Sequence, residues 1–313
     1  MTPLPLIIDC DPGVDDAIAL LLAFACPDTF DLVAVTTVTG NVAATQTARN
    51  ACIVRQQAGR EDVPVYAGAE APLSRPPVAA THFHGESGLG DLRLFDPDAG
   101  PSPGFAPDVI VEAVLARPPK SVRLAATGPL TNLALALRKA PEIAARLGPV
   151  VIMGGARSEG GNITASAEYN IHADPHAASE VFAAGLDLTL IGLDATHQVR
   201  ATPERVVALG NIPTASARMA AALLDFAYRT QLDLVGWDNP PLHDPCTIAF
   251  LLAPDLFQTR RVNLQVETSS PLTLGHTAVE FRVGPDRPAN ARWATRADGA
   301  GVFALLQDRL ARR

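Results

Sequence analysis

Short apolar runs alternate with longer segments of helical periodicity along the first two thirds of the chain. The apolar runs predict buried strands at residues 4–8, 32–38, 63–66, 122–126, 150–153 and 188–193. The segments between them carry apolar residues at helical spacing, which predicts helices at residues 17–25, 45–58, 109–115 and 175–184. Strands that are apolar along their whole length are typical of a parallel sheet covered on both faces. The pattern therefore predicts an α/β fold with an open, mostly parallel sheet and helices on both faces.

The last third of the chain has a different pattern. Helices are predicted at residues 215–229 and 302–310, and strands between them at residues 261–267, 278–283 and 291–295. Some of these strands are expected to be antiparallel, which makes the sheet mixed. Because no linker or low-complexity segment divides the chain, we expect residues 1–313 to form one domain. The long segment 67–107, rich in Pro and Gly, is expected to be a functional or mobile loop.

Composition excludes several classes of protein. Apolar residues make up 48% of the chain and charged residues 19%, which suffices to bury a core and argues against disorder. The net charge of −8, without a basic stripe, argues against nucleic acid as the main partner. The four cysteines form no CxxC pair, so we expect reduced thiols and no zinc site. Without a signal-peptide pattern or a membrane-length apolar run, we expect a cytoplasmic protein with no membrane partner.

Four carboxylates lie where the first predicted strand becomes the first predicted helix: Asp9, Asp11, Asp15 and Asp16. The period of an extended segment places Asp9 and Asp11 on the same side, and Pro and Gly at 12–13 make the turn. Carboxylates this close repel one another, so a cation, buried hydrogen bonds or the helix N-terminus must support their charge. All-oxygen ligands suit Ca²⁺ or Mg²⁺. A helix cap with a solvated acidic turn is the alternative, and it explains one Asp well but four poorly.

Small and polar residues follow three other predicted strands, at 38–41, 127–132 and 153–155. In open parallel sheets, ligands bind in the crevice beyond the carboxyl ends of the strands. Each of these segments alone is an ordinary turn. Together they outline a site at one edge of the sheet.

Two further polar clusters lie later in the chain. Asn162, Glu168 and Asn170 lie close together in sequence, and amide and carboxylate side chains hold vicinal hydroxyls because each hydroxyl both donates and accepts. The second cluster is His243-Asp244-Pro245. A lone Asn is also typical of an Asx turn, and Asp before Pro is typical of a helix start. These structural interpretations do not exclude a ligand role.

In this order along the chain, the clusters resemble the motifs of the inosine–uridine-preferring nucleoside hydrolase family. The acidic run at residues 9–16 resembles the family signature, and the resemblance covers about residues 5–250. His84 is preferred to His82 at the family's histidine position because a glycine follows it directly. The resemblance implies a single Rossmann-like α/β domain, commonly assembled as a homodimer or homotetramer.

The resemblance also implies roles for individual residues. The ligands of Ca²⁺ would be Asp11, Asp16, the carbonyl oxygen of Thr127, and Asp244. The substrate contacts would come from Asp15, Asn41, His84, Met153, Asn162, Glu168, Asn170 and Asp244. Asp11 would also act as the base toward a water at the cation, and Asp9 would order the cluster from behind. His243 would face the nucleobase, and we expect its imidazole to assist the departure of the base.

The activity implied is calcium-dependent hydrolysis of the N-glycosidic bond of ribonucleosides, purine and/or pyrimidine, to ribose and free base. The resemblance also implies a role in nucleoside salvage. Contacts to the base are less well defined by motif spacing. The candidates in this region are Phe226, Tyr228, Arg229, Gln231 and Trp237.

Two other functions share part of this pattern. A non-catalytic binder of ribose or nucleosides would keep the polar residues at 162–170 but could dispense with Asp11. A phosphatase of the haloacid dehalogenase type also places Asp-x-Asp after its first strand. There Gly-Thr or Gly-Ser normally follows, whereas this chain has Pro-Gly-Val at residues 12–14. The sequence therefore favours the hydrolase.

Overall fold

The apolar runs form the centre of one nine-stranded sheet in the computed structural model, which describes residues 2–236 and 238–312. Its strands are β1 (Leu4–Cys10), β2 (Phe30–Thr37), β3 (Val65–Ala67), β4 (Arg123–Ala126), β5 (Val150–Met153), β6 (Leu188–Ile191), β7 (Phe257–Val266), β8 (Thr277–Glu280) and β9 (Ala291–Ala297). Their order across the sheet is β3-β2-β1-β4-β5-β6-β9-β7-β8. All neighbours from β3 to β9 are parallel, and β7 runs antiparallel to both β9 and β8. The predicted mixed, mostly parallel sheet is confirmed.

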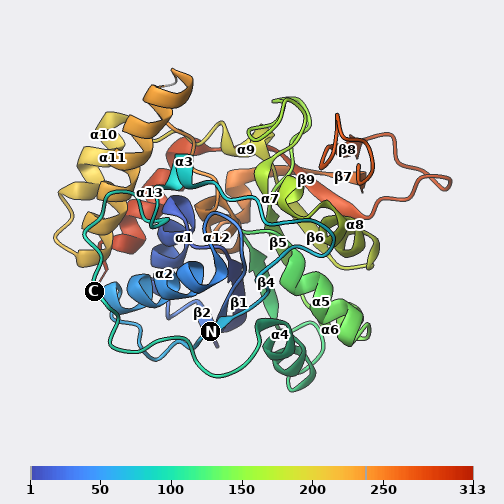
Figure 1. The fold of residues 1–313 in the computed structure, drawn as a ribbon, viewed down its shortest axis with the longest axis horizontal. Coiled ribbons are helices and arrows are strands. Elements are labelled where there is room, and N and C mark those ends of the chain that lie inside the picture. Colours follow the sequence, from blue (N-terminus) through green and yellow to red (C-terminus); the bar gives the residue numbers. More distant parts are fainter. Residues whose placement is uncertain (1, 237, 313) are drawn as a thin grey trace.

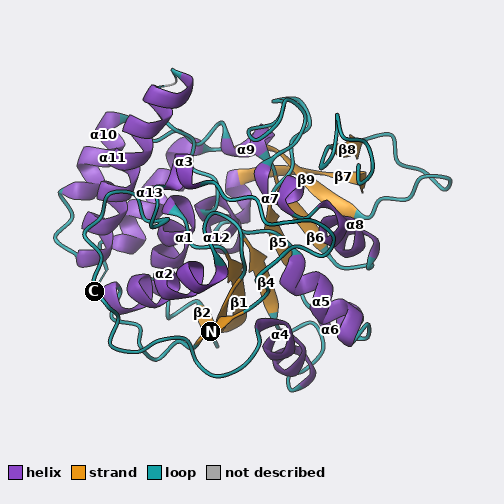
Figure 2. Cartoon of the chain, viewed as in Figure 1, coloured by secondary structure: helices purple, strands orange, loops and turns teal. Residues whose placement is uncertain are grey.

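Helices cover both faces of the sheet (Figures 1 and 2). They are α1 (Val14–Phe24), α2 (Ala44–Gln57), α3 (Thr81–His84), α4 (Ala106–Leu115), α5 (Thr131–Lys139), α6 (Ile143–Arg146), α7 (Tyr169–Ala173), α8 (Pro175–Ala183), α9 (Leu193–Thr196), α10 (Pro203–Gly210), α11 (Ala215–Val235), α12 (Pro245–Leu252), the 3₁₀ turn η1 (Pro254–Leu256) and α13 (Gly299–Leu310). Alternate residues of β1 point to opposite faces. Leu6 and Ile8 belong to a buried cluster that includes residues of α1, α2, α11, α12 and α13, whereas Ile7 belongs to a cluster that includes residues of α4, α5 and α8. This alternation fixes β1 at the centre of the fold.

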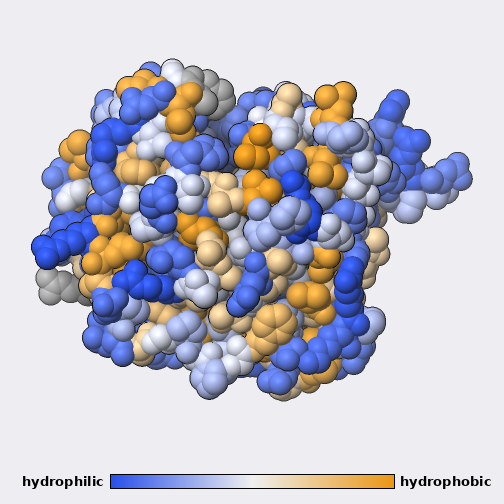
Figure 3. All heavy atoms as spheres, viewed as in Figure 1, coloured by the Kyte–Doolittle hydropathy of each residue, from blue (hydrophilic) through white to orange (hydrophobic). Residues whose placement is uncertain are grey.

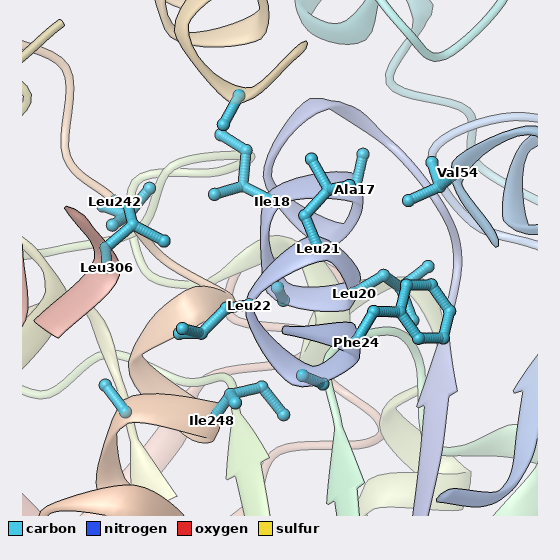
Figure 4. Close-up of a cluster of buried hydrophobic side chains, with 14 of the residues drawn as sticks. Ala17, Ile18, Leu20, Leu21, Leu22, Phe24, Val54, Leu242, Ile248 and Leu306 are labelled. Carbon is cyan, nitrogen blue, oxygen red and sulfur yellow. The ribbon is translucent and has the colours of Figure 1, made fainter. Parts of the chain in front are cut away.

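Helix α1 is buried almost all round because it lies between the sheet and other helices. Its apolar residues contact side chains from α2, α12 and α13 and from the segment before α12 (Figure 4). Leu21 and Leu22 are fully buried in this cluster. A helix held so tightly gives its N-terminal carboxylates, Asp15 and Asp16, fixed positions at the carboxyl end of β1.

The sequence predictions differ from the structure where tertiary context decides. Helices α5 and α10 were not predicted, since the first begins inside a polar turn motif and the second follows a short polar stretch. The strand predicted at 278–283 is only β8 and ends at Glu280, because the chain beyond it leaves the sheet as a projecting loop (Figure 1). Segment 67–107 runs from the end of β3 at Ala67 into the start of α4 at Ala106, and between them it holds one short helix, α3, and is otherwise irregular.

Among the described residues, no helix combines the length and apolar character that a membrane crossing requires. The four cysteines are buried free thiols, as expected. Figure 3 shows hydrophilic and hydrophobic residues intermixed over one face of the molecule, with hydrophilic residues dominating the projection at the right.

Truncation of Leu21 to Ala is expected to reduce the free energy of unfolding by about 2–5 kcal/mol, because it opens a cavity beneath the acidic turn. Leu115→Ala is the matched control. Leu115 is 40% exposed at the end of α4, and its loss is expected to cost less than about 1 kcal/mol. Urea denaturation of both variants measures the difference, and equal losses would show that the core around α1 is not closely packed.

Candidate active site

A cavity of about 650 Å³ opens at the carboxyl edge of the parallel strands. Most of the residues that the sequence predicted for the site line it: Asp15, Asn41, His84, Thr127, Met153, Asn162, Glu168, Asn170, His243 and Asp244. Asp11 and Asp16 are fully buried and contact this lining through Asn41 and Thr127. The strand ends therefore converge as the parallel topology requires.

The carboxylate of Asp16 joins three of these strand ends. Its Oδ1 accepts a hydrogen bond from the Thr127 hydroxyl at 2.7 Å. Its Oδ2 accepts from the Gly13 backbone N–H at 3.0 Å and from the Asn41 amide at 3.1 Å. One side chain thus fixes the turn after β1 against the loops that follow β2 and β4.

Asp11 has one satisfied and one unsatisfied oxygen. Its Oδ2 accepts the Asn41 backbone N–H at 2.7 Å, whereas its buried Oδ1 has no hydrogen-bond partner among the described residues. A Cβ at Gly40 would lie 2.0 Å from Oδ2, and one at Gly128 would lie 2.6 Å from Oδ1. Glycine is therefore required on both sides of this carboxylate. These contacts and the hydrogen bond to Oδ2 fix the orientation of the free Oδ1.

Carboxyl oxygens of Asp15, Asp16 and Asp244 all lie within 4.8 Å of one another. Burial first, and then neighbouring carboxylates, hold the pKa of Asp11 and of Asp244 well above its ordinary range. Burial and the charge of Asp15 raise the pKa of Asp16 to about 6. Because protein groups alone do not support full ionisation here, a cation with oxygen ligands fits the site. The buried Oδ1 of Asp11, which has no hydrogen-bond partner among the described residues, is a further oxygen ligand for such a cation.

Asp9 lies behind this cluster and is tied to the sheet. Its Oδ1 accepts hydrogen bonds from the Thr36 hydroxyl at 2.6 Å and the Asn132 amide at 2.8 Å. Burial raises the pKa of Asp9 to about 6. The Asn132 amide also donates to the Thr37 carbonyl, and its Oδ1 accepts the Ala69 N–H. Asn132 therefore connects Asp9 with β2 and with the chain after β3.

The polar residues at 162–170 are held by backbone contacts. Glu168 accepts hydrogen bonds from the N–H groups of Gly155 at 2.9 Å and Asn170 at 3.0 Å, and burial raises its pKa to about 7. Asn162 accepts the N–H of the residue that begins α7. The Asn170 amide donates to the Thr127 carbonyl at 2.7 Å and to that of Met153 at 3.2 Å. This amide therefore links the segment to the acidic cluster.

Both histidines at 82 and 84 line the cavity, but in different environments. His84 is buried, and its Nδ1 accepts the N–H of Val14 at 3.1 Å. Burial lowers the pKa of His84 to about 4, so its ring is neutral at pH 7. His82 is exposed at the rim. His84 therefore holds the start of α1 as well as facing the cavity.

His243 is a second neutral histidine. Burial, together with the positive charges of nearby groups, lowers its pKa to about 3. Its Nδ1 lies 2.8 Å from the Thr196 hydroxyl, and its ring centre lies 5.9 Å from that of His197. At neutral pH His243 can therefore offer a hydrogen bond from its ring but carries no positive charge.

The residues predicted as candidates for contacts to the nucleobase differ in whether they line the cavity. Gln231 lines the cavity, and its buried Oε1 has no hydrogen-bond partner among the described residues. Arg229 instead forms ion pairs with Asp91 and Asp225 on the surface. Phe226 lies under the Arg229 guanidinium and Tyr228 is not among the lining residues, while Trp237 lies outside the described residues.

Among the lining residues that the sequence analysis did not name, two are titratable: Glu159 and His197. They are bonded to each other at 2.9 Å across 38 positions of sequence. Neither lies in one of the polar clusters identified in the sequence, and His197 stands four residues after the strand predicted at 188–193. No local signal in the sequence pointed to this pair.

Comparison with known proteins agrees with this geometry. The family model described as inosine-uridine preferring nucleoside hydrolase matches residues 6–304. The pyrimidine-specific ribonucleoside hydrolase RihA of Photobacterium profundum is 42% identical over 308 residues, which is 98% of each chain.

Solved structures give the same result. The plant nucleoside hydrolase PpNRh1 superposes with a TM-score of 0.91 at 32% identity, covering 99% of this chain and 100% of that one. The purine-preferring ribonucleoside hydrolase from Gardnerella vaginalis gives 0.91 at 31% identity, covering 98% of both. The acidic turn, the converging strand ends and these matches together establish that the chain is an N-ribosyl hydrolase belonging to the inosine–uridine-preferring nucleoside hydrolase family.

Proposed function

We propose that this chain hydrolyses the N-glycosidic bond of ribonucleosides in a calcium-dependent reaction, releasing ribose and a free nucleobase. The observation that carries the proposal is the buried cluster of carboxylates around Asp11, Asp16 and Asp244, whose pKa values are raised by burial and by neighbouring carboxylates, Asp15 included. Such a cluster is best explained as the ligand set of a hard divalent cation. The family membership favours catalysis over simple nucleoside binding or phosphate transfer.

The proposed calcium ligands are Asp11, Asp16, Asp244 and the carbonyl oxygen of Thr127. All are oxygen donors, and Asp16 and the Thr127 residue are already in contact through the hydroxyl. When bound, Ca²⁺ supplies positive charge that orients a water molecule and the sugar hydroxyls. The residues around the ion then activate the water and hold the sugar.

Asp11 is the proposed base. Its Oδ2 is fixed by the Asn41 N–H, so the carboxylate does not rotate, while its Oδ1 is left to accept the proton of the attacking water. The burial that raises the pKa of Asp11 also makes its carboxylate a better proton acceptor. This is the water-activating half of an inverting glycoside hydrolysis.

The ribose is proposed to lie against Asp15, Asn162, Glu168, Asn170 and Asp244, with Asn41 and Met153 beside it. These residues share the lining of one cavity. Carboxylates around the sugar favour the positive charge that develops on the ribosyl group as the base departs. A 2-deoxyribose leaves a buried acceptor without its partner, which costs about 1–3 kcal/mol and favours ribonucleosides.

His243 is the proposed group that assists the leaving base. A Thr196 hydroxyl that donates to Nδ1 leaves the ring proton on Nε2, from which the imidazole can donate to the base. Since burial keeps the ring neutral, the assistance is a hydrogen bond and not transfer from an imidazolium. Gln231, with its unsatisfied oxygen in the same cavity, is placed to contact the base as well.

Release of reducing sugar from uridine, cytidine, inosine, adenosine and guanosine, with and without a chelator, tests the proposal. We expect pyrimidine ribonucleosides to be preferred, because relatives named pyrimidine-specific are 42–43% identical and the purine-preferring structure is 31% identical. Loss of all activity with the chelator and recovery with calcium would support the metal. Stable binding of intact nucleoside without product would contradict the reaction.

We further propose that residues 1–313 form one hydrolase domain that assembles as a homodimer or homotetramer. The continuous nine-stranded sheet supports the single domain, and the resemblance to the family supports the assembly. Light scattering of the purified chain measures its mass in solution. A monomer at micromolar concentration would contradict the assembly.

Replacing Asp11 by Ala is expected to abolish tight calcium binding and to leave less than about a tenth of the wild-type kcat, since the residue is both ligand and base. Calorimetry with calcium and the sugar-release assay measure the two effects. Asp31→Ala, an exposed position on β2, is the control and is expected to retain both. An Asp11→Ala variant that keeps more than about a tenth of the wild-type kcat would exclude Asp11 as the base.

Replacing His243 by Ala is expected to lower kcat at least about tenfold on the preferred natural nucleoside and less than about threefold on p-nitrophenyl riboside. The nitrophenolate leaves as a stable anion and needs little help, whereas a natural base needs a hydrogen bond. Steady-state kinetics on both substrates measure the contrast. Similar losses on both would remove His243 from catalysis and make it a packing residue.

Calcium is expected to stabilise the fold more as pH rises. Burial raises the pKa of Asp9 and Asp16 to about 6 and that of Glu168 to about 7, so the folded chain binds these protons more tightly than the unfolded chain. The metal-free protein therefore loses stability as pH rises from about 4 to about 7. A calcium concentration of about 100 times the Kd measured at pH 7.5 should raise Tm by about 5 °C at pH 7.5, and the same concentration should raise it much less at pH 5, where protonated carboxylates bind calcium more weakly. Thermal unfolding in calcium and in chelator measures this, and equal shifts at both pH values would contradict it.

A further inference from the structure

Three consecutive residues at one rim of the cavity are held to the short helix α9. The carboxylate of Asp194 accepts the backbone N–H groups of Arg157 at 2.8 Å and Ser158 at 2.9 Å. The next residue, Glu159, is bonded through Oε2 to Nδ1 of His197 at 2.9 Å. Asp194 lies in α9 and His197 directly follows its last residue, one helical turn further on, so this stretch of the chain holds the segment at two points.

The chain then runs directly into the proposed sugar-binding residues. Gly161, Asn162 and Ile163 all line the cavity. The turn is closed on itself by hydrogen bonds from Gly161 N–H to the Ala165 carbonyl and from Asn162 N–H to the Ala167 carbonyl. Because the turn is internally bonded, it moves as a unit. Its attachment at 157–159 therefore contributes to the position of Asn162, together with the hydrogen bond that Asn162 accepts from the first residue of α7.

Glu159 and His197 also join two walls of the cavity. Both line it, and the His197 ring lies beside that of His243, whose Nδ1 contacts the preceding Thr196. This contact therefore connects the sugar-binding turn with the wall that carries His243, in addition to the two hydrogen bonds that Asp194 accepts. A carboxylate only accepts, so Nδ1 of His197 must be the donor.

The pair is more sheltered than an ordinary surface ion pair. The His197 side chain is 9% exposed and that of Glu159 is 42% exposed. Burial lowers the pKa of His197, and the hydrogen bond with Glu159 opposes that effect. The charged groups that also face this ring are Arg200 and Asp194. A contact of this kind holds without a full positive charge on the imidazole, because the neutral ring still donates from Nδ1.

We propose that Glu159 and His197 are positioning residues that form a latch, holding the turn at 157–168 against α9 and so placing Asn162 on the sugar. The proposal rests on the proposed function for its effect on substrate, but the latch itself is a property of the free chain. Its loss loosens the turn without touching the acidic cluster. We therefore expect weaker binding of sugar at unchanged affinity for calcium.

Hydrogen exchange of the free enzyme tests the latch without any activity. Amides of residues 157–168 should exchange faster in Glu159→Ala and in His197→Ala than in the wild type. His197→Asn should restore protection, because its amide nitrogen stands where Nδ1 stood. Glu180→Gln is the control, since it weakens a surface pair with Arg138 far from the cavity. Wild-type exchange in both Ala variants would overturn the proposal, even in a chain that proves inactive.

Kinetics then measure the effect on substrate. In each Ala variant KM for the preferred nucleoside and Ki for ribose should rise about fivefold, with kcat within about twofold of the wild type. The double variant should be no worse than either single one, because both remove the same contact. Additive losses, or a fall in kcat with KM unchanged, would overturn the latch. An inactive wild-type chain with a latch intact by exchange would contradict the proposed function alone.

Discussion

The burial of negative charge at the carboxyl end of β1 is the constraint around which the rest of the structure is arranged. Asp9, Asp11 and Asp16 are all fully buried within one short stretch of chain. Hydrogen-bond donors reach them from the ends of other strands, notably through Asn41, Thr127 and Asn132. Buried carboxylates with too few donors are costly, so each of these contacts is needed by both the fold and the site.

The hydrogen bonds to these buried carboxylates also require the backbone of neighbouring loops to approach closely. Glycines on either side of Asp11 allow the loops after β2 and β4 to touch its carboxylate. At Gly68 a Cβ would lie 2.3 Å from the Asn132 amide oxygen, so the chain after β3 can approach Asn132 only because this residue is glycine. These contacts are possible only because the core below holds β1 and α1 rigidly.

Much of this was readable from the sequence because it is local. The strands of the parallel sheet have continuous apolar runs, and the polar residues of the site follow those strands directly. The remainder depends on contacts between distant segments. The Glu159–His197 contact, the Thr196–His243 contact and the neutral state of His243 follow from burial and tertiary packing. Helix α5 was not predicted because its first turn belongs to the polar motif of the site and therefore lacks an apolar helical pattern.

The place of Asp244 in the chain has a consequence for biosynthesis. Asp15 and Asp16 are synthesised well before Asp244, which follows Asp16 by 228 positions in the chain and completes the group of carboxylates. Throughout the synthesis of that stretch, the growing chain carries the acidic turn without its third carboxylate. Because domains fold as units during synthesis, the cation-binding geometry forms only after the segment that carries Asp244 has left the ribosome.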